Sequence, residues 1–446
     1  MDRPGTAPGA APPAGGAHDA VIVGAGLAGA AAATLLARGG WRVALVERKR
    51  FPRRKVCGEC LAASNLPLLD ALGVGAAFEA SAGAELRRVA LLAGGTPVEA
   101  PLPPAPRAER RWGRALGRDA LDALLVDAAR AAGADVLQPC ALREIAGGPG
   151  RWRCSVRGTE GGGIGDAVLE APVLIDAHGS WETLPFERGI GARGRRDSDL
   201  LAFKAVFEGA GHSPDTISVL ALDGGYGGIV TADGGRTTVA GCVRRDRLGA
   251  LRARAPGARA GEVFERWLRG RPDIGGVLAN ARRDGPWLAS GPLAPGIRTG
   301  VADGVLRIGN AGAEAHPLLG EGMSMALQSA ALLAARLLDP VRGVDPRRAV
   351  DRGAGGVAGD DRAADAFAVR LLALQRAHHR DFRREFAPRL RLAAAFAHAA
   401  MRPGPARALA ALARRHPALL THGARRGGKV RLAIEPSTRA RAGARA

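Results

Sequence analysis

The sequence predicts an α/β fold with a Rossmann-like domain, an inserted, mainly antiparallel β-sheet domain and a C-terminal helical region. A strand, a glycine-rich turn, a helix and a second strand follow one another over residues 20–47. Residues 200–245 alternate between apolar and polar side chains, which is typical of half-buried strands. Arg-rich helices are indicated over 362–386 and 390–402.

Composition limits the classes of protein that fit the chain. Its 446 residues have room for two or three domains. The formal charge of +21 suggests nucleic-acid binding, but the arginines are spread along the chain and the single Tyr leaves no basic patch with interleaved aromatic residues. We therefore expect no nucleic-acid partner. The absence of a long apolar run and of a signal-peptide pattern favours a soluble, cytoplasmic protein.

The five cysteines are an odd number, which favours free thiols in a reducing compartment. Cys57 and Cys60 form a CxxC pair, but a second pair that would complete a zinc site is missing. We therefore expect no metal.

The glycine-rich turn is the most informative motif. Gly24, Gly26 and Gly29 have GxGxxG spacing directly after the strand 20–23. The first glycine permits a sharp turn, the second lets the backbone approach a pyrophosphate, and the third lets the helix pack closely on the sheet. Free N–H groups at the positive end of that helix then bind the phosphates. The motif predicts a dinucleotide-binding unit.

The second strand of this unit ends on Glu47, about twenty residues after the glycines, where a carboxylate accepts hydrogen bonds from ribose hydroxyls. Because that carboxylate repels a 2′-phosphate, FAD or NAD is favoured over NADP. The basic stretch from Arg48 to Lys55 follows. It either helps to hold a polyanionic cofactor or is ordinary solvated charge.

The rest of the chain continues the α/β pattern. We expect helices over 61–72, 118–132 and 260–268, and strands over 84–99, 136–142, 151–156, 168–175 and 305–308. The last strand leads through two glycine-rich turns into a helix over 323–338, which repeats the strand-to-helix arrangement of the first unit. The expected division is a disordered tail (1–17), a discontinuous cofactor domain (18–82, 108–185 and 295–340), a substrate domain (83–107 and 186–294), and a linker with a helical tail (341–446).

Several motifs occur in one order: the glycine motif, Glu47, Arg118, Asp176 and the segment 309–322. In this order they resemble the flavoproteins built on the p-hydroxybenzoate hydroxylase fold. The sequence Lys-Val-Cys-Gly-Glu at 55–59 is similar to the geranylgeranyl reductase-related branch of that group. The resemblance covers roughly residues 20–338.

This resemblance implies FAD as the cofactor and NAD(P)H as a transient electron donor. The cofactor-binding candidates that it implies, together with those of the glycine motif, are Gly24, Ala25, Gly26, Gly29, Glu47, Arg48, Arg118, Asp176, Gly179, Gly309, Asn310, Pro317, Gly320, Gly322 and Met323. Asn310 departs from the family, which usually has Asp there, and His178 stands in an unusual place beside Asp176.

The favoured function is a monooxygenase that uses reduced flavin and O2 to hydroxylate an apolar small molecule of aromatic or polyketide-like type. The alternative is a reductase that saturates isoprenoid double bonds. For that function the amphipathic, Arg-rich tail offers a surface for peripheral membrane or lipid contact. A flavin-dependent halogenase is disfavoured because a Trp-x-Trp-x-Ile-Pro stretch is missing.

Four side chains are candidates for the chemistry, each with a structural alternative. Cys57 and Glu59 are candidate proton donors near the flavin, or structural residues of their loop. Tyr226 orients a substrate or packs in a sheet, and His316 tunes the flavin or fills space. Lys204 lies in an alternating strand, and we interpret it as a surface lysine.

Overall fold

The computed structural model describes residues 17–105, 110–159, 165–180, 195–349 and 357–426. A five-stranded parallel sheet forms the first layer, in the order β18 (Val305–Arg307), β11 (Val173–Asp176), β1 (Ala20–Val23), β2 (Val43–Val46) and β7 (Asp135–Leu137). Its strands are short and almost wholly buried, as is usual for a parallel sheet covered on both faces.

Helices cover one face of the parallel sheet, and a small sheet covers the other. The helical face holds α1 (Leu27–Arg38), α4 (Arg118–Ala131) and α9 (Glu321–Leu337), whose apolar side chains share one core with Ile22, Leu45 and Ile175. The opposite face packs on the three-stranded sheet β8 (Cys140–Ala146), β9 (Trp152–Gly158) and β10 (Ala167–Ala171). The expected strand 136–142 is divided in two at Pro139, which has no N–H to donate to a ladder.

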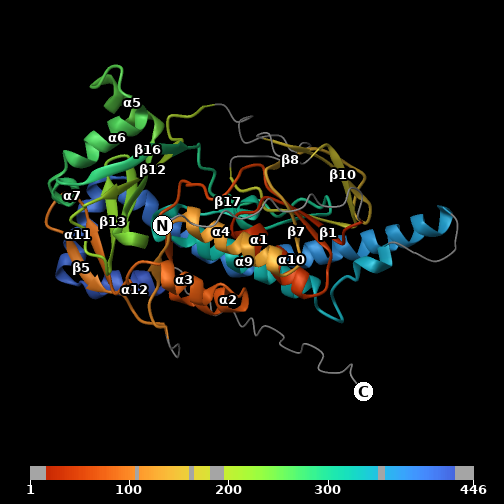
Figure 1. The fold of residues 1–446 in the computed structure, drawn as a ribbon. Helices are drawn as coiled ribbons and strands as arrows, with labels where there is room; N and C mark the ends of the chain where they lie inside the picture. Colours follow the sequence, from red (N-terminus) through yellow and green to blue (C-terminus); the bar gives the residue numbers. More distant parts are fainter. Residues whose placement is uncertain (1–16, 106–109, 160–164, 181–194, 350–356, 427–446) are drawn as a thin grey trace, which may run out of the picture.

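A second, seven-stranded sheet contains the strands expected over 200–245. Its order is β16 (Arg282–Ser290), β12 (Leu200–Glu208), β15 (Thr237–Arg244), β14 (Gly225–Thr231), β13 (Thr216–Leu222), β4 (Arg88–Leu92) and β5 (Val98–Pro101). All neighbours are antiparallel except β13 and β4. One face packs on α5 (Arg245–Ala253), α6 (Ala260–Arg269) and α7 (Pro272–Leu278), which lie beside this sheet in Figure 1.

The chain between the two sheets is less regular than expected. The helix expected over 61–72 is reduced to α2 (Leu66–Ala71), because residues before it form β3 (Cys60–Leu61), which pairs with β6 (Arg114–Ala115). A further helix, α3 (Gly75–Ser81), follows. Within the described ranges no helix is both long and apolar enough to cross a bilayer.

The C-terminal region differs from the two-helix expectation. A single helix, α10 (Val357–Ala400), runs through Pro388 and extends along the molecule toward the seven-stranded sheet (Figure 1). Contacts on both sides of Pro388 keep the helix continuous. Phe382 and Phe386 are fully buried before the proline, and Arg389 is bound to Glu321 of α9 after it. The chain ends in α11 (Pro403–Arg415) and α12 (Ala418–Arg426), and α12 lies against β5.

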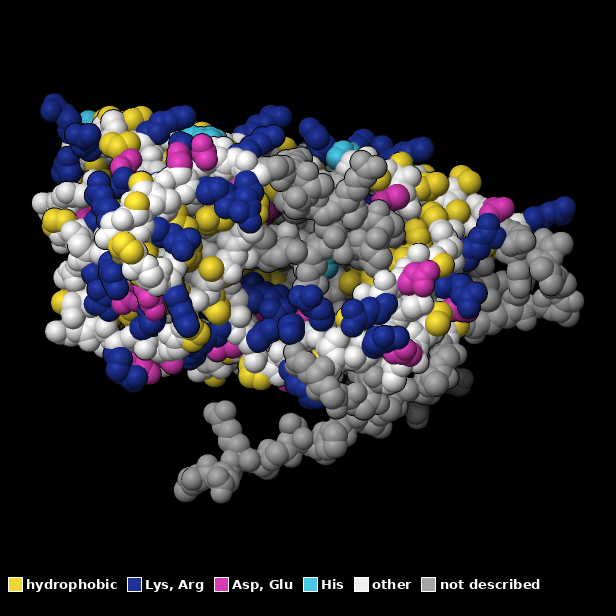
Figure 2. Space-filling model, turned by 90° about the horizontal axis from the view of Figure 1, so that it is seen from above, with side chains coloured by type: hydrophobic (Ala, Val, Ile, Leu, Met, Phe, Trp, Pro, Cys, Tyr) yellow, Lys and Arg dark blue, Asp and Glu magenta, His cyan; other side chains and the backbone are white. Residues whose placement is uncertain are grey.

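Basic side chains are spread over the surface. Figure 2 shows Lys and Arg across the whole of one face, with Asp and Glu among them. Many of the ion pairs among described residues join partly exposed side chains, such as Arg88 with Glu99, and these contribute little to stability.

The packing of α10 makes a prediction about stability. Phe382→Ala empties a fully buried site between α10 and the segment 313–325, so we expect the free energy of unfolding to fall by about 3–5 kcal/mol. Val369→Ala is the control, because Val369 is 68% exposed on the same helix; its effect should stay within about 0.5 kcal/mol. Urea unfolding of both variants measures the difference, and equal stabilities would contradict a packed α10.

Candidate functional site

The glycine turn joins β1 to α1 and requires glycine at two positions for steric reasons. Gly24 has a φ of +99°, and a Cβ there would lie 2.6 Å from the carbonyl oxygen of Ala177. A Cβ on Gly29 would lie 1.8 Å from the carbonyl oxygen of Gly24. The helix therefore starts close against the sheet, with its first N–H groups at the carboxyl edge.

Glu47 is fixed against this turn. Its carboxylate is buried and accepts hydrogen bonds from the backbone N–H of Ala25 at 3.0 Å and of Lys49 at 2.9 Å. Arg53 lies 3.3 Å from the same carboxylate. A carboxylate held at the end of β2 is placed to bind the ribose of a dinucleotide, as the sequence predicts. Arg48 has an exposed side chain, and its carbonyl accepts a hydrogen bond from Thr159.

Two cations lie at the open side of Gly26. A Cβ there would lie 3.3 Å from Nζ of Lys55 and 3.7 Å from a guanidinium nitrogen of Arg118. Both cations share the fully buried carboxylate of Asp122, which Arg118 binds through two hydrogen bonds of 2.8 and 2.9 Å. Burial lowers the pKa of Lys55, and Asp122 opposes that shift.

The charges around Gly26 fit a diphosphate. Two cations share one carboxylate, so positive charge remains next to the N-terminus of α1, where backbone N–H groups are free to bind an anion. The backbone of Gly26 leaves space that any larger residue would fill. The residues present therefore suit the pyrophosphate of FAD, which Gly26, Lys55 and Arg118 would hold.

The segment before α9 leaves backbone uncovered. Gly320 has a φ of +68°, and a Cβ on Gly320 or Gly322 would meet nothing within 4 Å. Pro317 is exposed, whereas Met323 is buried beneath the start of the helix. Open backbone at a helix N-terminus suits the flavin end of the cofactor.

The neighbouring turns fix this segment. Gly309 donates its N–H to the hydroxyl of Ser329 at 2.9 Å, and the amide of Asn310 donates to the hydroxyl of Ser180 at 2.7 Å. The Asn310 side chain is therefore engaged within the protein, and it joins the ends of two parallel strands.

Asp176 ends β11 and is fully buried. It accepts a hydrogen bond from the backbone of His178 at 3.2 Å and is also bound to the imidazole of that histidine. Gly179 follows with a φ of +101°. The unusual His178 thus closes the turn onto Asp176, and residues 181–194 of this segment lie outside the described ranges.

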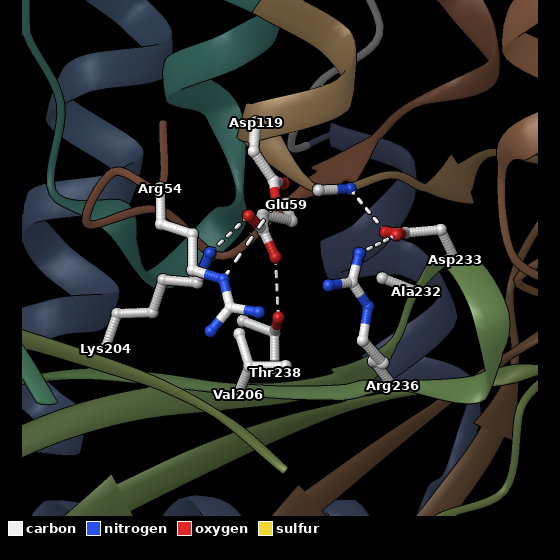
Figure 3. Close-up of a pocket in the computed structure, with 10 residues that line it drawn as sticks. Arg54, Glu59, Asp119, Lys204, Val206, Ala232, Asp233, Arg236 and Thr238 are labelled. Atoms are coloured by element: carbon white, nitrogen blue, oxygen red, sulfur yellow. Dashed lines mark hydrogen bonds and ion pairs between the residues drawn. The ribbon is translucent and has the colours of Figure 1, made fainter. Parts of the chain in front are cut away.

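The loop 55–60 is joined to the seven-stranded sheet through Glu59 (Figure 3). The Glu59 carboxylate is 2% exposed and is bound by Lys204 of β12 and by Thr238 of β15, the latter at 2.5 Å. It also accepts a hydrogen bond from the backbone N–H of Arg118 at 2.8 Å. One carboxylate therefore connects the loop, the start of α4 and the second sheet.

The interpretation of Lys204 as a surface lysine is wrong. Its side chain is 1% exposed, because β12 lies between β15 and β16 and this residue points toward the loop that carries Glu59. Sequence reasoning also missed Asp122 and Thr238. Arg118 and Asp122 are four residues apart on a helix, a spacing from which their ion pair could have been predicted. The sequence around Thr238 gives no comparable indication.

A small pocket opens beside Glu59 and Lys204. Its empty space is about 190 Å³, part of it open to solvent, and its lining includes ionic groups that are already paired, such as Arg236 with Asp233 and Arg54 with Asp119 (Figure 3). Binding sites for small molecules are mainly apolar. This pocket is therefore a charged gap whose lining does not suit a flavin ring.

Two of the catalytic candidates lie together. Tyr226 and His316 are buried, and the Tyr226 hydroxyl hydrogen-bonds to Nδ1 of His316 at 3.0 Å. Burial raises the pKa of Tyr226, and burial together with His398 lowers the pKa of His316 to about 4. Both groups are therefore neutral at pH 7.

The surroundings of this pair are apolar and come from four parts of the chain. Around Tyr226 lies one apolar cluster, whose members include Leu200 and Ala202 of β12, Leu318 of the turn before α9, Ala397 near the end of α10, and Val56 of the loop 55–60. Cys57, next in that loop, is half-buried, and its sulfur accepts a hydrogen bond from the backbone of Glu59 at 3.4 Å. The thiol also interacts with the side chain of Arg118, so it lies between its own loop and the start of α4.

Together, the parallel sheet, the glycine turn with its two cations and the separate antiparallel sheet define a dinucleotide-binding flavoprotein. Residues 17–352 match the family described as FAD binding domain, and the chain belongs to this family. The predicted resemblance to the family of FAD-dependent oxidoreductases is therefore confirmed. Use of NAD(P)H as the electron donor is typical of this family.

Proteins that are similar to this chain are named for several different activities. It is 53% identical over 64 residues to 6-methylpretetramide 4-monooxygenase of Streptomyces rimosus, a match that covers 14% of this chain and 15% of that protein. It is 28% identical over 334 residues to menaquinone reductase of Mycobacterium tuberculosis, covering 72% and 76%. The structure of the myxobacterial chondrochloren halogenase has a TM-score of 0.66 at 20% identity, covering 93% and 94%, and shares the fold.

The arrangement of Gly26, Lys55 and Arg118 leads to a prediction about cofactor retention. Gly26→Val places a side chain between the helix N-terminus and the cations of Lys55 and Arg118, so the purified variant should lose most of its bound FAD. Gly249→Val is the control, because a Cβ on Gly249 meets nothing within 4 Å. The ratio of flavin to protein absorbance measures retention. A Gly26→Val protein with a full complement of FAD would place the pyrophosphate elsewhere.

The buried Glu59–Lys204 pair makes a second prediction. Lys204→Met leaves the Glu59 carboxylate buried without its cation, which should lower the free energy of unfolding by about 3–5 kcal/mol. The double variant Glu59→Gln/Lys204→Met removes both charges. Its loss of unfolding free energy should be smaller than the sum of the losses in Lys204→Met and Glu59→Gln alone.

The control for this pair is Arg282→Met. Arg282 is paired with Glu208 on the neighbouring strand but is 76% exposed, so its loss should cost no more than about 1 kcal/mol. Chemical denaturation of the four variants gives the comparison. If Lys204→Met were as stable as Arg282→Met, the buried pair would contribute no more to stability than an exposed one.

Proposed function

We propose that the protein is a monooxygenase that hydroxylates an apolar small molecule of aromatic or polyketide-like type. The observation that carries the proposal is the neutral Tyr226–His316 pair within the apolar cluster between the second sheet and the turn before α9. Binding sites of this kind combine apolar walls with a few convergent polar groups that fix orientation. FAD supplies the redox chemistry when bound.

The residues of this chain would position the substrate and exclude water. Apolar side chains from β12, the turn 317–319 and α10 keep the region dry. Because the pKa of His316 is about 4, its imidazole is a neutral hydrogen-bond acceptor above that pH. It can hold the proton of the Tyr226 hydroxyl, which leaves the phenol oxygen free to accept a hydrogen bond from a substrate hydroxyl.

A second function is supported by a different observation. The menaquinone reductase of Mycobacterium tuberculosis matches this chain over 334 residues, and its name specifies reduction. For reduction of an isoprenoid double bond, Cys57 is the candidate proton donor. Cys57→Ala should then slow turnover strongly and Cys57→Ser less so, with flavin reduction unchanged. A packing role instead leaves turnover near the parental rate.

The activities separate in one assay. Oxidation of NADH and NADPH, O2 uptake and product mass are followed with a panel of phenols, aromatic polyketides and prenyl lipids, with and without bromide. Monooxygenation predicts O2 uptake and a product that gains one oxygen atom. A product that gains two hydrogen atoms without O2 uptake would establish the reductase, and a bromide-dependent brominated product would establish a halogenase.

The Tyr226–His316 pair gives the residue-level prediction. Tyr226→Phe removes only the hydroxyl, so we expect turnover to fall by about tenfold to a hundredfold with FAD content unchanged. Thr216→Val, which removes a buried hydroxyl from β13, is the control and should keep the parental rate. Because the pKa of His316 is near 4, its protonation should reduce activity only as the pH falls toward 4. Unchanged turnover in Tyr226→Phe would contradict an orienting role.

A further inference from the structure

The last two helices expose leucine side chains next to arginines. Leu409 and Leu412 of α11 are 36% and 48% exposed, and Leu419 of α12 is 46% exposed. Exposed basic side chains accompany them, namely Arg402, Arg407, Arg414, Arg415 and Arg425. We call this surface the Leu-Arg face.

The segment that carries the Leu-Arg face has no acidic side chains of its own. The chain contains neither Asp nor Glu between Phe386 and Arg426. Elsewhere on the surface several arginines are paired with carboxylates, as Arg157 is with Asp166. A surface with arginines and no nearby carboxylates has a positive potential, which attracts anions and keeps the protein soluble.

The orientation of α11 is fixed. Ala406, Ala410 and Ala413 are buried, so this side of the helix faces the protein. At 3.6 residues per turn, Leu409 and Leu412 lie on one flank of the buried side, and Arg407 and Arg414 lie on the other. Near the start of α11, Ala406 belongs to the apolar cluster of Tyr226. The following helix, α12, is tied to β5 by a hydrogen bond from Thr421 to Pro101. The leucines cannot turn inward without breaking these contacts.

We propose that the Leu-Arg face binds the surface of an anionic lipid bilayer. Helices that expose both leucines and arginines have the composition of amphipathic helices that lie in a membrane interface, and α11 exposes the two kinds of side chain on its two flanks. Each arginine near an anionic surface strengthens the attraction, and the leucines enter the boundary of the acyl region. An acidic protein partner would use the arginines but gives no reason for three exposed leucines.

The Leu-Arg face lies on the outer side of a helix whose inner side contacts the apolar cluster around Tyr226. The buried side of α11 and the end of α10 both contribute to the apolar cluster around Tyr226 and Leu318. A membrane bound at the Leu-Arg face would therefore be separated from that cluster by little more than one helix. An apolar compound dissolved in the bilayer is the class of substrate that this placement suits. The membrane proposal itself does not depend on the reaction type, because binding is measured without substrate or donor.

Vesicle co-sedimentation of the full-length protein tests the proposal. Vesicles of phosphatidylcholine alone are compared with vesicles that contain phosphatidylglycerol, at low and high salt. We expect binding to the anionic vesicles only, and weaker binding at high salt. Arg407→Gln/Arg414→Gln should weaken partitioning by about thirtyfold at low salt. Leu409→Ser/Leu412→Ser should weaken it by about tenfold or more.

Matched controls come from elsewhere on the chain. Arg252→Gln/Arg254→Gln removes two exposed arginines at the C-terminal end of α5, a helix that Figure 1 places at the opposite end of the seven-stranded sheet from α11 and α12. Val369→Ser removes an exposed apolar side chain from α10. Both should bind vesicles as the parent does. Absence of vesicle binding, an equal loss in the controls, or binding to soluble polyglutamate without binding to vesicles would each overturn the proposal.

Discussion

The Glu59 carboxylate is the interaction on which the arrangement of the two sheets depends. It is buried, and its partners come from three elements: Lys204 and Thr238 from the second sheet, and the backbone of Arg118 at the start of α4. A buried carboxylate is tolerated only when its charge and lone pairs are satisfied. The loop 55–60 therefore has one stable position, and that position places Lys55 beside Gly26.

The cofactor edge follows from the parallel sheet. All five strands run in one direction, so their carboxyl ends meet along one edge. That edge gathers Gly24, Glu47, Asp176 and Gly309, although nearly three hundred residues of chain separate the first from the last. The second sheet and α10 then close the apolar region around Tyr226, so that the cofactor edge and the candidate substrate region share the turn before α9.

Much of the fold was predictable because its signals are local. The glycine motif, the acid at the end of β2 and the alternating strands each follow from residues close together in the sequence. Contacts over long distances leave no such pattern: Glu59 binds Lys204 across 145 residues, and Tyr226 meets His316 across 90. Long-range contacts also explain why the two helices predicted over 362–386 and 390–402 form one: the buried Phe382 and Phe386 and the bound Arg389 keep α10 continuous.

A crystal structure of the protein with FAD tests the central claim most directly. That claim is that Glu59 fixes the loop 55–60 so that Lys55 and Arg118 hold the cofactor's diphosphate at Gly26. The account predicts the diphosphate in contact with both cations, the adenosine ribose at Glu47, and the Glu59–Lys204 pair intact. A diphosphate away from Gly26, or a loop displaced so that Glu59 no longer binds Lys204, would contradict it.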